Sequence, residues 1–265
     1  MKKWSLILAL LFSAALWSQQ IVCSAEDRNA FEVKIEEIKD IPGSAPGTLL
    51  ASVGSTFLDT PYVAGTLEIG DSEQLVINLS GLDCTTFVEN VLAFSMLIRE
   101  KDTSFDNYIE ALQKIRYRDG QLSGYASRLH YFSEWIRNNE KKGLVRDMTA
   151  SLGGIPADKK LNFMTSHREL YPRLAASPAF KEMEAVEEKL DGQEYTYIPS
   201  SVLVSRLSEL KHGDIIALAT GINGLDVTHT GIVFRKSNGK YHLLHASSRG
   251  QVEISEKPLL EYLAG

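Results

Sequence analysis

The stretch Gly81-Leu82-Asp83-Cys84-Thr85-Thr86-Phe87-Val88-Glu89 places a cysteine at the start of an apolar run. Apolar side chains recur at helical spacing after it, namely at Phe87, Val88, Val91, Leu92, Phe94 and Leu97. This spacing predicts a helix that begins at Cys84. The positive N-terminal end of a helix dipole favours a thiolate, which is the nucleophilic form of cysteine. A buried structural cysteine is the alternative interpretation.

The first residues indicate an export signal. Two lysines precede the apolar segment Trp4–Trp17 of about 14 residues, which is within the signal-peptide range of roughly 7–15 and short of the roughly 20 needed to cross a bilayer. Small residues at Cys23 and Ala25 predict cleavage after Ala25. Lipid attachment at Cys23 is disfavoured because Val22 is too bulky for that processing site. We expect residues 1–25 to be removed, and the mature chain to be periplasmic or extracellular without a transmembrane segment.

The mature chain would keep Cys84 as its one cysteine, so it would have no internal disulfide. Its length of about 240 residues suits a single catalytic domain over 26–265. The full chain has 28 basic and 34 acidic residues, and loss of two lysines brings the net charge near −8. With no basic stripe, this charge argues against binding of nucleic acid. We expect a monomer.

The character of the sequence changes along the chain. A charged lead-in arm is expected over 26–47, and a helical insertion over about 101–190. The last third instead contains short β-type runs, at 214–219, 228–234, 241–246 and 251–254. The pairs Asn223-Gly224 and Asn238-Gly239 between these runs are hairpin signals. Helices followed by a strand meander predict an α+β fold, in which the cysteine helix packs on an antiparallel sheet.

Two histidines lie on adjacent predicted strands. The Asn238-Gly239 turn folds the strand of His245 back on the strand of His229, so His245 can fix the tautomer of His229. Gly231 shares a face with His229 and leaves room for a close neighbour. A cysteine with two histidines suggests a nucleophile, a base and an orienting group. His242 points to the opposite face from His245, where we expect it at the surface, and this argues against a joint metal site. His229 taken alone is equally compatible with an edge-strand histidine that a local hydrogen bond satisfies.

Aromatic and basic residues elsewhere are candidates for substrate contacts. Tyr62 precedes the cysteine helix, and its hydroxyl could donate to an oxyanion together with the Cys84 N–H, or it could serve only in packing. The segment 123–135 mixes aromatics with an arginine and a histidine. Because aromatic faces stack on sugars and arginine binds carboxylates in a fork, it suggests a glycopeptide pocket. The expected ligand-binding side chains there are Arg128, His130, Tyr131 and Trp135. The alternative is an amphipathic helix that buries Trp135 and its apolar neighbours.

These motifs resemble those of the NlpC-type papain-like cysteine hydrolases, which act on bacterial cell-wall peptides. The matching segments are Pro61-Tyr62, Asp83-Cys84-Thr85, His229-Thr230-Gly231-Ile232 and His245-Ala246. Longer segments are similar to a narrower group, the N-acetylmuramoyl-L-alanine amidase-like family. They are 60–68, 127–132 and 224–231, within a resemblance that covers about residues 49–263. The first and last of them add Thr66 and Asp226 to the substrate-binding candidates.

The resemblance implies a papain-like core with a helical insertion between nucleophile and base. It implies hydrolysis of the amide between N-acetylmuramic acid and L-alanine in peptidoglycan fragments, by Cys84, His229 and His245, with no cofactor and no metal. An insertion that walls the cleft would favour soluble turnover fragments over polymer. An endopeptidase that cuts the stem peptide between D-Glu and the diamino acid is the main rival. The broader NlpC-type group has Ser-Gly after its Asp-Cys, whereas this chain has Thr85-Thr86. This difference weakens the endopeptidase interpretation. A non-catalytic wall-binding module and a zinc amidase remain open, although the zinc enzyme needs three spaced ligands.

Overall fold

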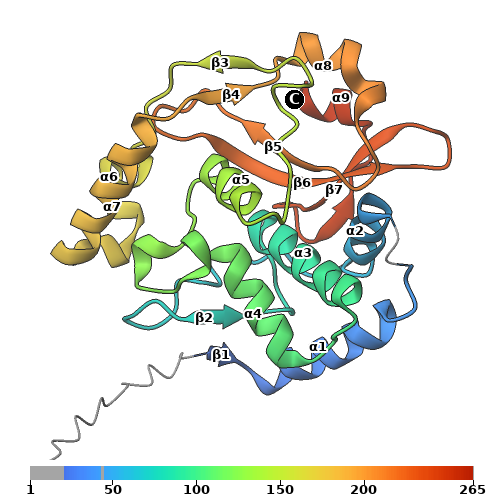
Figure 1. Ribbon diagram of the computed structural model, residues 1–265, viewed down its shortest axis with the longest axis horizontal. Coiled ribbons are helices and arrows are strands. Elements are labelled where there is room, and N and C mark those ends of the chain that lie inside the picture. The colour runs from blue at the N-terminus through green and yellow to red at the C-terminus, as the bar shows by residue number, and fades with distance from the viewer. Residues whose placement is uncertain (1–20, 43–44, 265) are drawn as a thin grey trace, which may run out of the picture.

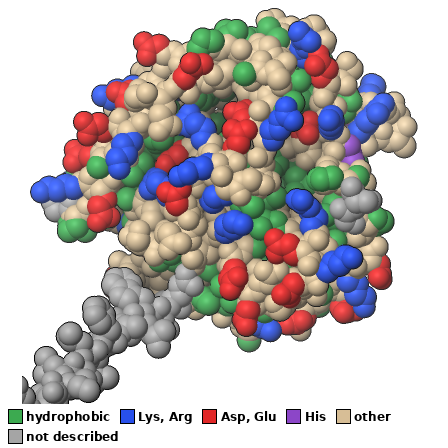
Figure 2. All heavy atoms as spheres, viewed as in Figure 1, with side chains coloured by type: hydrophobic (Ala, Val, Ile, Leu, Met, Phe, Trp, Pro, Cys, Tyr) green, Lys and Arg blue, Asp and Glu red, His purple; other side chains and the backbone are tan. Residues whose placement is uncertain are grey.

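The computed structural model describes residues 21–42 and 45–264 of the protein (Figure 1). Residues 1–20 of the expected signal peptide lie outside the described residues. Within the described ranges, no helix is long and apolar enough to span a bilayer. On the face shown in Figure 2, basic and acidic side chains are interspersed rather than gathered into a patch of one sign.

The elements follow one another along the chain in a helix-rich first part and a strand-rich last part. The α-helices are α1 (Ala25–Ile38), α2 (Pro46–Ser55), α3 (Cys84–Glu100), α4 (Phe105–Arg116), α5 (Phe132–Lys141), α6 (Phe163–Ser166), α7 (Ser177–Asp191), α8 (Ser200–Arg206) and α9 (Leu259–Leu263). The 3₁₀ turns are η1 (Arg118–Gly120), η2 (Tyr125–Ser127), η3 (Arg168–Leu170), η4 (Pro172–Ala175) and η5 (Leu207–Glu209). The strands are β1 (Ile21–Cys23), β2 (Leu75–Ile77), β3 (Ile155–Ala157), β4 (Tyr195–Tyr197), β5 (Ile215–Ala219), β6 (Val227–Arg235), β7 (Tyr241–Ala246) and β8 (Val252–Ile254).

The main sheet is four-stranded and antiparallel, in the order β5-β6-β7-β8. The four predicted β-runs are confirmed within a residue or two at each end. Both hairpin signals fall in the turns between these strands, where Gly224 has a φ of 79° and Gly239 a φ of 80°. Glycine adopts this left-handed backbone without the steric cost that a Cβ imposes. The chain therefore has the helix-and-antiparallel-sheet architecture that the sequence predicts.

The two faces of the sheet bury different side chains because alternate strand residues point to opposite sides. Ile232 and Leu244 face the main core, which they share with α3. Val233 and Leu243 face a smaller core under α8 and α9. Figure 1 accordingly shows α3 on one side of the sheet and α8 and α9 on the other. Each large apolar side chain that is fully buried in this way contributes about 1.5–3 kcal/mol.

The segment expected to be a lead-in arm is instead part of the core. Helix α1 is capped by Ser24, whose Oγ accepts the Asp27 N–H at 3.0 Å, and strand β1 before it pairs in parallel with β2. Phe31, Ile35 and Ile38 are buried along one stripe of the helix. The charged residues between them occupy the other faces, which is why composition alone suggested an arm.

The expected helical insertion divides into two parts. Helix α4 belongs to the main core, where Arg116 at its end forms a buried ion pair with Glu89 of α3, Nε to Oε2 2.7 Å. Helices α6 and α7 and the turn η2 instead bury a separate apolar cluster around Tyr131 and Met164. Figure 1 shows α6 and α7 at one end of the molecule, away from α2. Only this second part projects from the main core.

Candidate active site

Cys84 is the first residue of α3, and its position is fixed by a reciprocal cap. The Asp83 carboxylate accepts the Thr86 N–H at 2.7 Å, and the Thr86 hydroxyl accepts the Asp83 N–H at 2.9 Å. This capping box starts the helix at the cysteine and orients its side chain. The sequence prediction of a helix beginning at Cys84 is confirmed.

The thiol of Cys84 meets strand β6. Burial raises its pKa, and the nearby Asp83 carboxylate raises it further. Hydrogen bonds from the Thr230 backbone N–H and the Thr85 side chain act in the opposite direction without reversing the shift. The thiol therefore keeps its proton at neutral pH. This direction differs from the sequence expectation of a resting thiolate, because desolvation outweighs the helix dipole.

His229 and His245 are in direct contact. His229 Nε2 lies 2.7 Å from His245 Nδ1, and the two rings are nearly perpendicular. Gly231 makes this approach possible, because a Cβ there would lie 2.9 Å from the His245 Cβ and 2.8 Å from the Leu244 carbonyl oxygen. The predicted proximity of the two rings and the small residue beside them are both present in the structure.

Both imidazoles are neutral at physiological pH. Burial lowers the pKa of His229. Burial, with the neighbouring His229 and Arg249, lowers the pKa of His245 to about 4. A neutral imidazole has one nitrogen free to accept a proton, which is what a general base requires. On His229, Nε2 is engaged with His245, so Nδ1 is the nitrogen left to face another group.

Tyr62 lies beside the start of α3. It forms a parallel bridge with Leu82, and its own N–H donates to the Gly250 carbonyl at 2.7 Å. Burial raises the pKa of its phenol, and the adjacent Cys84 and Asp83 raise it further. The hydroxyl therefore remains a hydrogen-bond donor across the physiological pH range.

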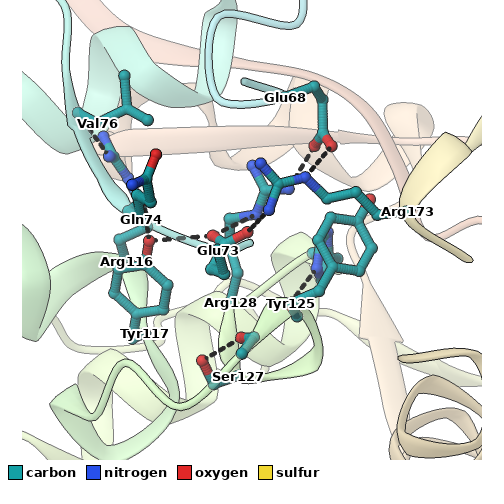
Figure 3. A network of polar contacts seen from close by, with 12 residues as sticks. Glu68, Glu73, Gln74, Val76, Arg116, Tyr117, Tyr125, Ser127, Arg128 and Arg173 are labelled. Carbon is teal, nitrogen blue, oxygen red and sulfur yellow. Dashed lines mark hydrogen bonds and ion pairs between the residues drawn. The ribbon is translucent and has the colours of Figure 1, made fainter. Parts of the chain in front are cut away.

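Arg128 lies in a buried network of charges rather than in an open pocket (Figure 3). Its side chain is 8% exposed and pairs with Glu68 and Glu73. Arg173 pairs with the same two carboxylates, and both guanidinium groups lie over the ring of Tyr125. Glu68 and Arg173 also line a cavity of about 330 Å³. Glu68 and Glu73 therefore already bind the guanidinium group of Arg128, which we had expected to bind substrate carboxylates.

The aromatic candidates of this region make contacts within the protein. His130 Nε2 lies 2.9 Å from the Tyr125 carbonyl oxygen, and burial lowers the pKa of His130 well below its usual value. The Tyr131 hydroxyl donates to Glu187 at 2.7 Å. Trp135 is 1% exposed and stacks on Phe132. These contacts match the packing alternative for the segment.

Asp226 and Thr66 are the last two substrate-binding candidates. The Asp226 carboxylate accepts the Ser133 N–H at 2.7 Å and the Val227 N–H at 2.8 Å, so it joins α5 to the start of β6. Thr66 lies in the loop after Tyr62, and within the described part of the chain its buried hydroxyl has no hydrogen-bond partner. The described contacts thus link Tyr62 to Cys84, Cys84 to the backbone of Thr230 beside His229, and His229 to His245.

A cavity of about 1260 Å³ runs along the free edge of β5, and its lining includes Trp135, Leu218 and Tyr262. Among the described residues that line it, Cys84 and the two histidines are absent. Tyr262 of α9 connects the two regions, because its ring lies 5.3 Å from that of His245. The candidate site is therefore defined by the contacts of its side chains rather than by this cavity.

Two residues near the histidines were missed by the sequence reasoning. Glu253 of β8 is directly cross-strand from His245, with Oε1 3.9 Å from His245 Nε2. Tyr262 of α9 packs against the smaller core under α8 and α9, and its ring contacts the same imidazole. The alternation of the run 251–254 would have placed Glu253 on the face of the histidines, had the register of β8 been known. Within the described ranges, no group of three or more histidine, cysteine or acidic side chains is arranged to hold a metal ion.

Comparisons with known proteins identify relatives of the whole fold. A crystal structure of an N-acetylmuramoyl-L-alanine amidase from Bacteroides uniformis is 42% identical, with a TM-score of 0.78 over 83% of this chain and 93% of that chain. A putative xylanase from Bacteroides fragilis is 44% identical, with a TM-score of 0.75 over 80% and 93% of the two chains. The Legionella pneumophila protein LPG0564 is 22% identical, with a TM-score of 0.67 over 89% of each chain, and shares the fold.

The family comparison covers most of the chain. No curated protein matches the sequence. A family model described as AmiA-like, N-acetylmuramoyl-L-alanine amidase-like, matches residues 52–265, which include the capped cysteine helix and the whole main sheet. The chain therefore belongs to the AmiA-like family of N-acetylmuramoyl-L-alanine amidase-like proteins.

Proposed function

We propose that this protein is a peptidoglycan amidase that hydrolyses the bond between the lactyl group of N-acetylmuramic acid and L-alanine, with Cys84 as its nucleophile. The observation that carries the proposal is the contact of His229 Nε2 with His245 Nδ1 at 2.7 Å, next to the Thr230 N–H that bonds the thiol. Membership of the amidase-like family supports the choice of bond. The proposal includes an NlpC-type papain-like core, which suits a helix that carries the cysteine and packs on an antiparallel sheet.

The first step forms a thioester. The Cys84 sulfur attacks the lactyl carbonyl carbon while its proton passes to His229 Nδ1, since thiol and imidazole are both neutral at rest. The carbonyl π electrons move to oxygen, where the Cys84 N–H and the Tyr62 hydroxyl donate hydrogen bonds. One such donor is worth about 2.7–4 kcal/mol in an acyl-transfer enzyme. The carbon–nitrogen bond then breaks, and His229 gives its proton to the leaving amine of alanine.

The second step restores the enzyme. Water attacks the thioester carbon as His229 accepts one of its protons. The carbon–sulfur bond breaks, and that proton returns to the Cys84 sulfur. The products are a free muramic acid carboxyl group and an alanine-headed peptide. His245 keeps its contact with His229 Nε2 throughout and so maintains the tautomer that this sequence needs.

Several further properties belong to the same proposal. Export through the predicted signal peptide would place the enzyme in the periplasm or outside the cell, as a monomer. The ion pairs that join Glu68 to Arg173 tie the loop after Tyr62 to the turn η4. A wall fixed in this way suits small muramyl peptides better than intact polymer. Subcellular fractionation and size-exclusion chromatography of the secreted chain test the location and the monomeric state.

Mass spectrometry of products tests the reaction. Muramyl peptides, polymeric peptidoglycan and xylan are each incubated with a chain that begins at Ile21 and so retains Cys23, as the wild type, as Cys84→Ala and as Cys23→Ser, the matched cysteine control. We expect an alanine-headed peptide from muramyl peptides with the wild type and Cys23→Ser, and none with Cys84→Ala. Cleavage inside the stem peptide would favour the endopeptidase instead. The Bacteroides fragilis relative is named a putative xylanase. Release of sugars from xylan would therefore contradict the proposed amidase activity.

A further inference from the structure

One nitrogen of the histidine pair lacks a partner. His245 is 1% exposed, and its Nδ1 is engaged by His229. Within the described part of the chain, His245 Nε2 is buried without a hydrogen bond. A buried polar atom left unpaired destabilises the fold, so a native site is expected to supply a partner.

Glu253 is the group placed to supply it. Its carboxylate Oε1 lies 3.9 Å from His245 Nε2, and the two residues are paired in the register of β7 and β8. The side chain is 38% exposed, which leaves it free to rotate. A hydrogen bond needs a separation near 2.9 Å, so a movement of about 1 Å or one bridging water completes the contact.

The other groups around His245 do not replace this acceptor. His229 on β6 holds the opposite nitrogen, and Tyr262 on α9 meets the imidazole ring edge to face, with its centroid 5.3 Å away. Arg249, in the turn before β8, is a cation and cannot accept a proton. Glu253 is thus the negative group that faces the unpaired nitrogen.

The nitrogen of His245 that carries the proton then determines the direction of the hydrogen bond to His229. If the His245 proton is on Nε2, facing Glu253, then Nδ1 must accept from His229 Nε2–H. His229 Nδ1 is left without a proton and can act as a base toward Cys84. With the His245 proton on Nδ1, its Nε2 lone pair would face a carboxylate, and His229 Nδ1 would carry a hydrogen and could not accept one. We propose that Glu253 is a positioning residue that selects the first arrangement, an inference that rests on the cysteine mechanism proposed above.

The test reads the tautomer directly. Nitrogen-15 NMR of histidine-labelled protein reports which His245 nitrogen carries the proton, in the wild type, Glu253→Ala, Glu253→Gln and Glu256→Ala. Glu256 is an exposed acid three residues away and serves as the matched control. We expect the Nε2–H form in the wild type, in Glu256→Ala and in Glu253→Gln, whose amide oxygen still accepts. Glu253→Ala should lose the preference. A wild-type Nδ1–H form, or an unchanged tautomer in Glu253→Ala, would overturn the proposal.

A second readout follows the consequence at the thiol without any cell-wall substrate. Alkylation of Cys84 by iodoacetamide is measured against pH in the same variants, each carrying Cys23→Ser. We expect Glu253→Ala to react on the order of tenfold more slowly at neutral pH. A positioned base accelerates a reaction by about 10²–10⁴-fold, and loss of the tautomer preference should remove part of that acceleration. Glu253→Gln should restore most of the rate. Equal rates in all variants would count against Glu253. A tautomer effect in a protein that cleaves no muramyl peptide would defeat the amidase and leave the role of Glu253 standing.

Discussion

Gly231→Ala is the substitution whose effect can be worked out most directly from the structure. A Cβ at this position would lie 2.8 Å from the Leu243 Cδ1, 2.8 Å from the Leu244 carbonyl oxygen and 2.9 Å from the His245 Cβ. The leucine methyl is the end of a flexible side chain and can move. The carbonyl oxygen and the histidine Cβ cannot move without displacing β7 from β6.

The expected cost follows from the behaviour of overfilled cores. Insertion of one methyl group into a tightly packed interior costs about 1–3 kcal/mol. For a chain of this size each kcal/mol lowers Tm by about 2–4 °C, so a decrease of roughly 2–12 °C is expected. The His229–His245 separation of 2.7 Å should lengthen as β7 moves, and turnover should fall with it.

Thermal unfolding and steady-state kinetics measure the two effects. Gly221→Ala is the matched control, because no atom lies within 4 Å of the Cβ that it would introduce. We expect the control to keep the wild-type Tm and kcat. A Gly231→Ala protein that is indistinguishable from Gly221→Ala in both measurements would refute the argument that close approach at this glycine determines the geometry of the site.

Three other predictions concern stability. Arg116→Met should lower the free energy of unfolding in urea by about 3–5 kcal/mol, because it leaves the Glu89 carboxyl without its partner in a site where the paired side chains are 2% and 3% exposed; a loss under about 1 kcal/mol would contradict this. A chain that starts at Glu26 should melt below one that starts at Ile21, since it lacks β1 and the serine cap of α1, and the cap alone is worth about 1 kcal/mol; equal melting temperatures would show that the strand contributes nothing. His245 has a pKa of about 4 in the fold, below its ordinary 6.5, so the unfolded chain binds more protons between these values and stability should fall as the pH drops from about 6.5 to about 4. His245→Asn should flatten that slope in pH-dependent melts, and an unchanged slope would assign the titration to another group.

Local signals explain why the sheet was predictable. The strand runs are short, apolar and separated by Gly and Asn residues, and Asn238-Gly239 lies in the turn between β6 and β7, where Gly239 has a φ of 80°, so sequence and structure agree there. The start of α3 at Cys84 is similarly local, because the cap involves residues three apart. The catalytic roles of these residues remain predictions that the experiments above address.

Pairings between distant residues explain what the sequence could not predict. Arg128 was expected to meet a ligand, but its partner Glu68 lies 60 positions away, and residue type alone does not show which acid will fold against it. Helix α1 was taken for an arm because its apolar stripe is narrow, and its burial depends on β2 and α3 being in place. Glu253 was missed for the same reason, since its relation to His245 exists only through the register of β8.

His229, His245 and Glu253 lie on three successive strands, so under the proposed mechanism the length of the turns becomes a determinant of activity. Their contacts run across the sheet, so the alignment depends on how many residues connect one strand to the next. A single inserted or deleted residue between β6 and β7 would move every side chain of β7 to the opposite face. Such a protein would still form a hairpin, yet His245 would lie in the wrong core. We therefore expect insertions around α6 and α7 to be tolerated, whereas the two turns that flank β7 should tolerate substitution but not insertion.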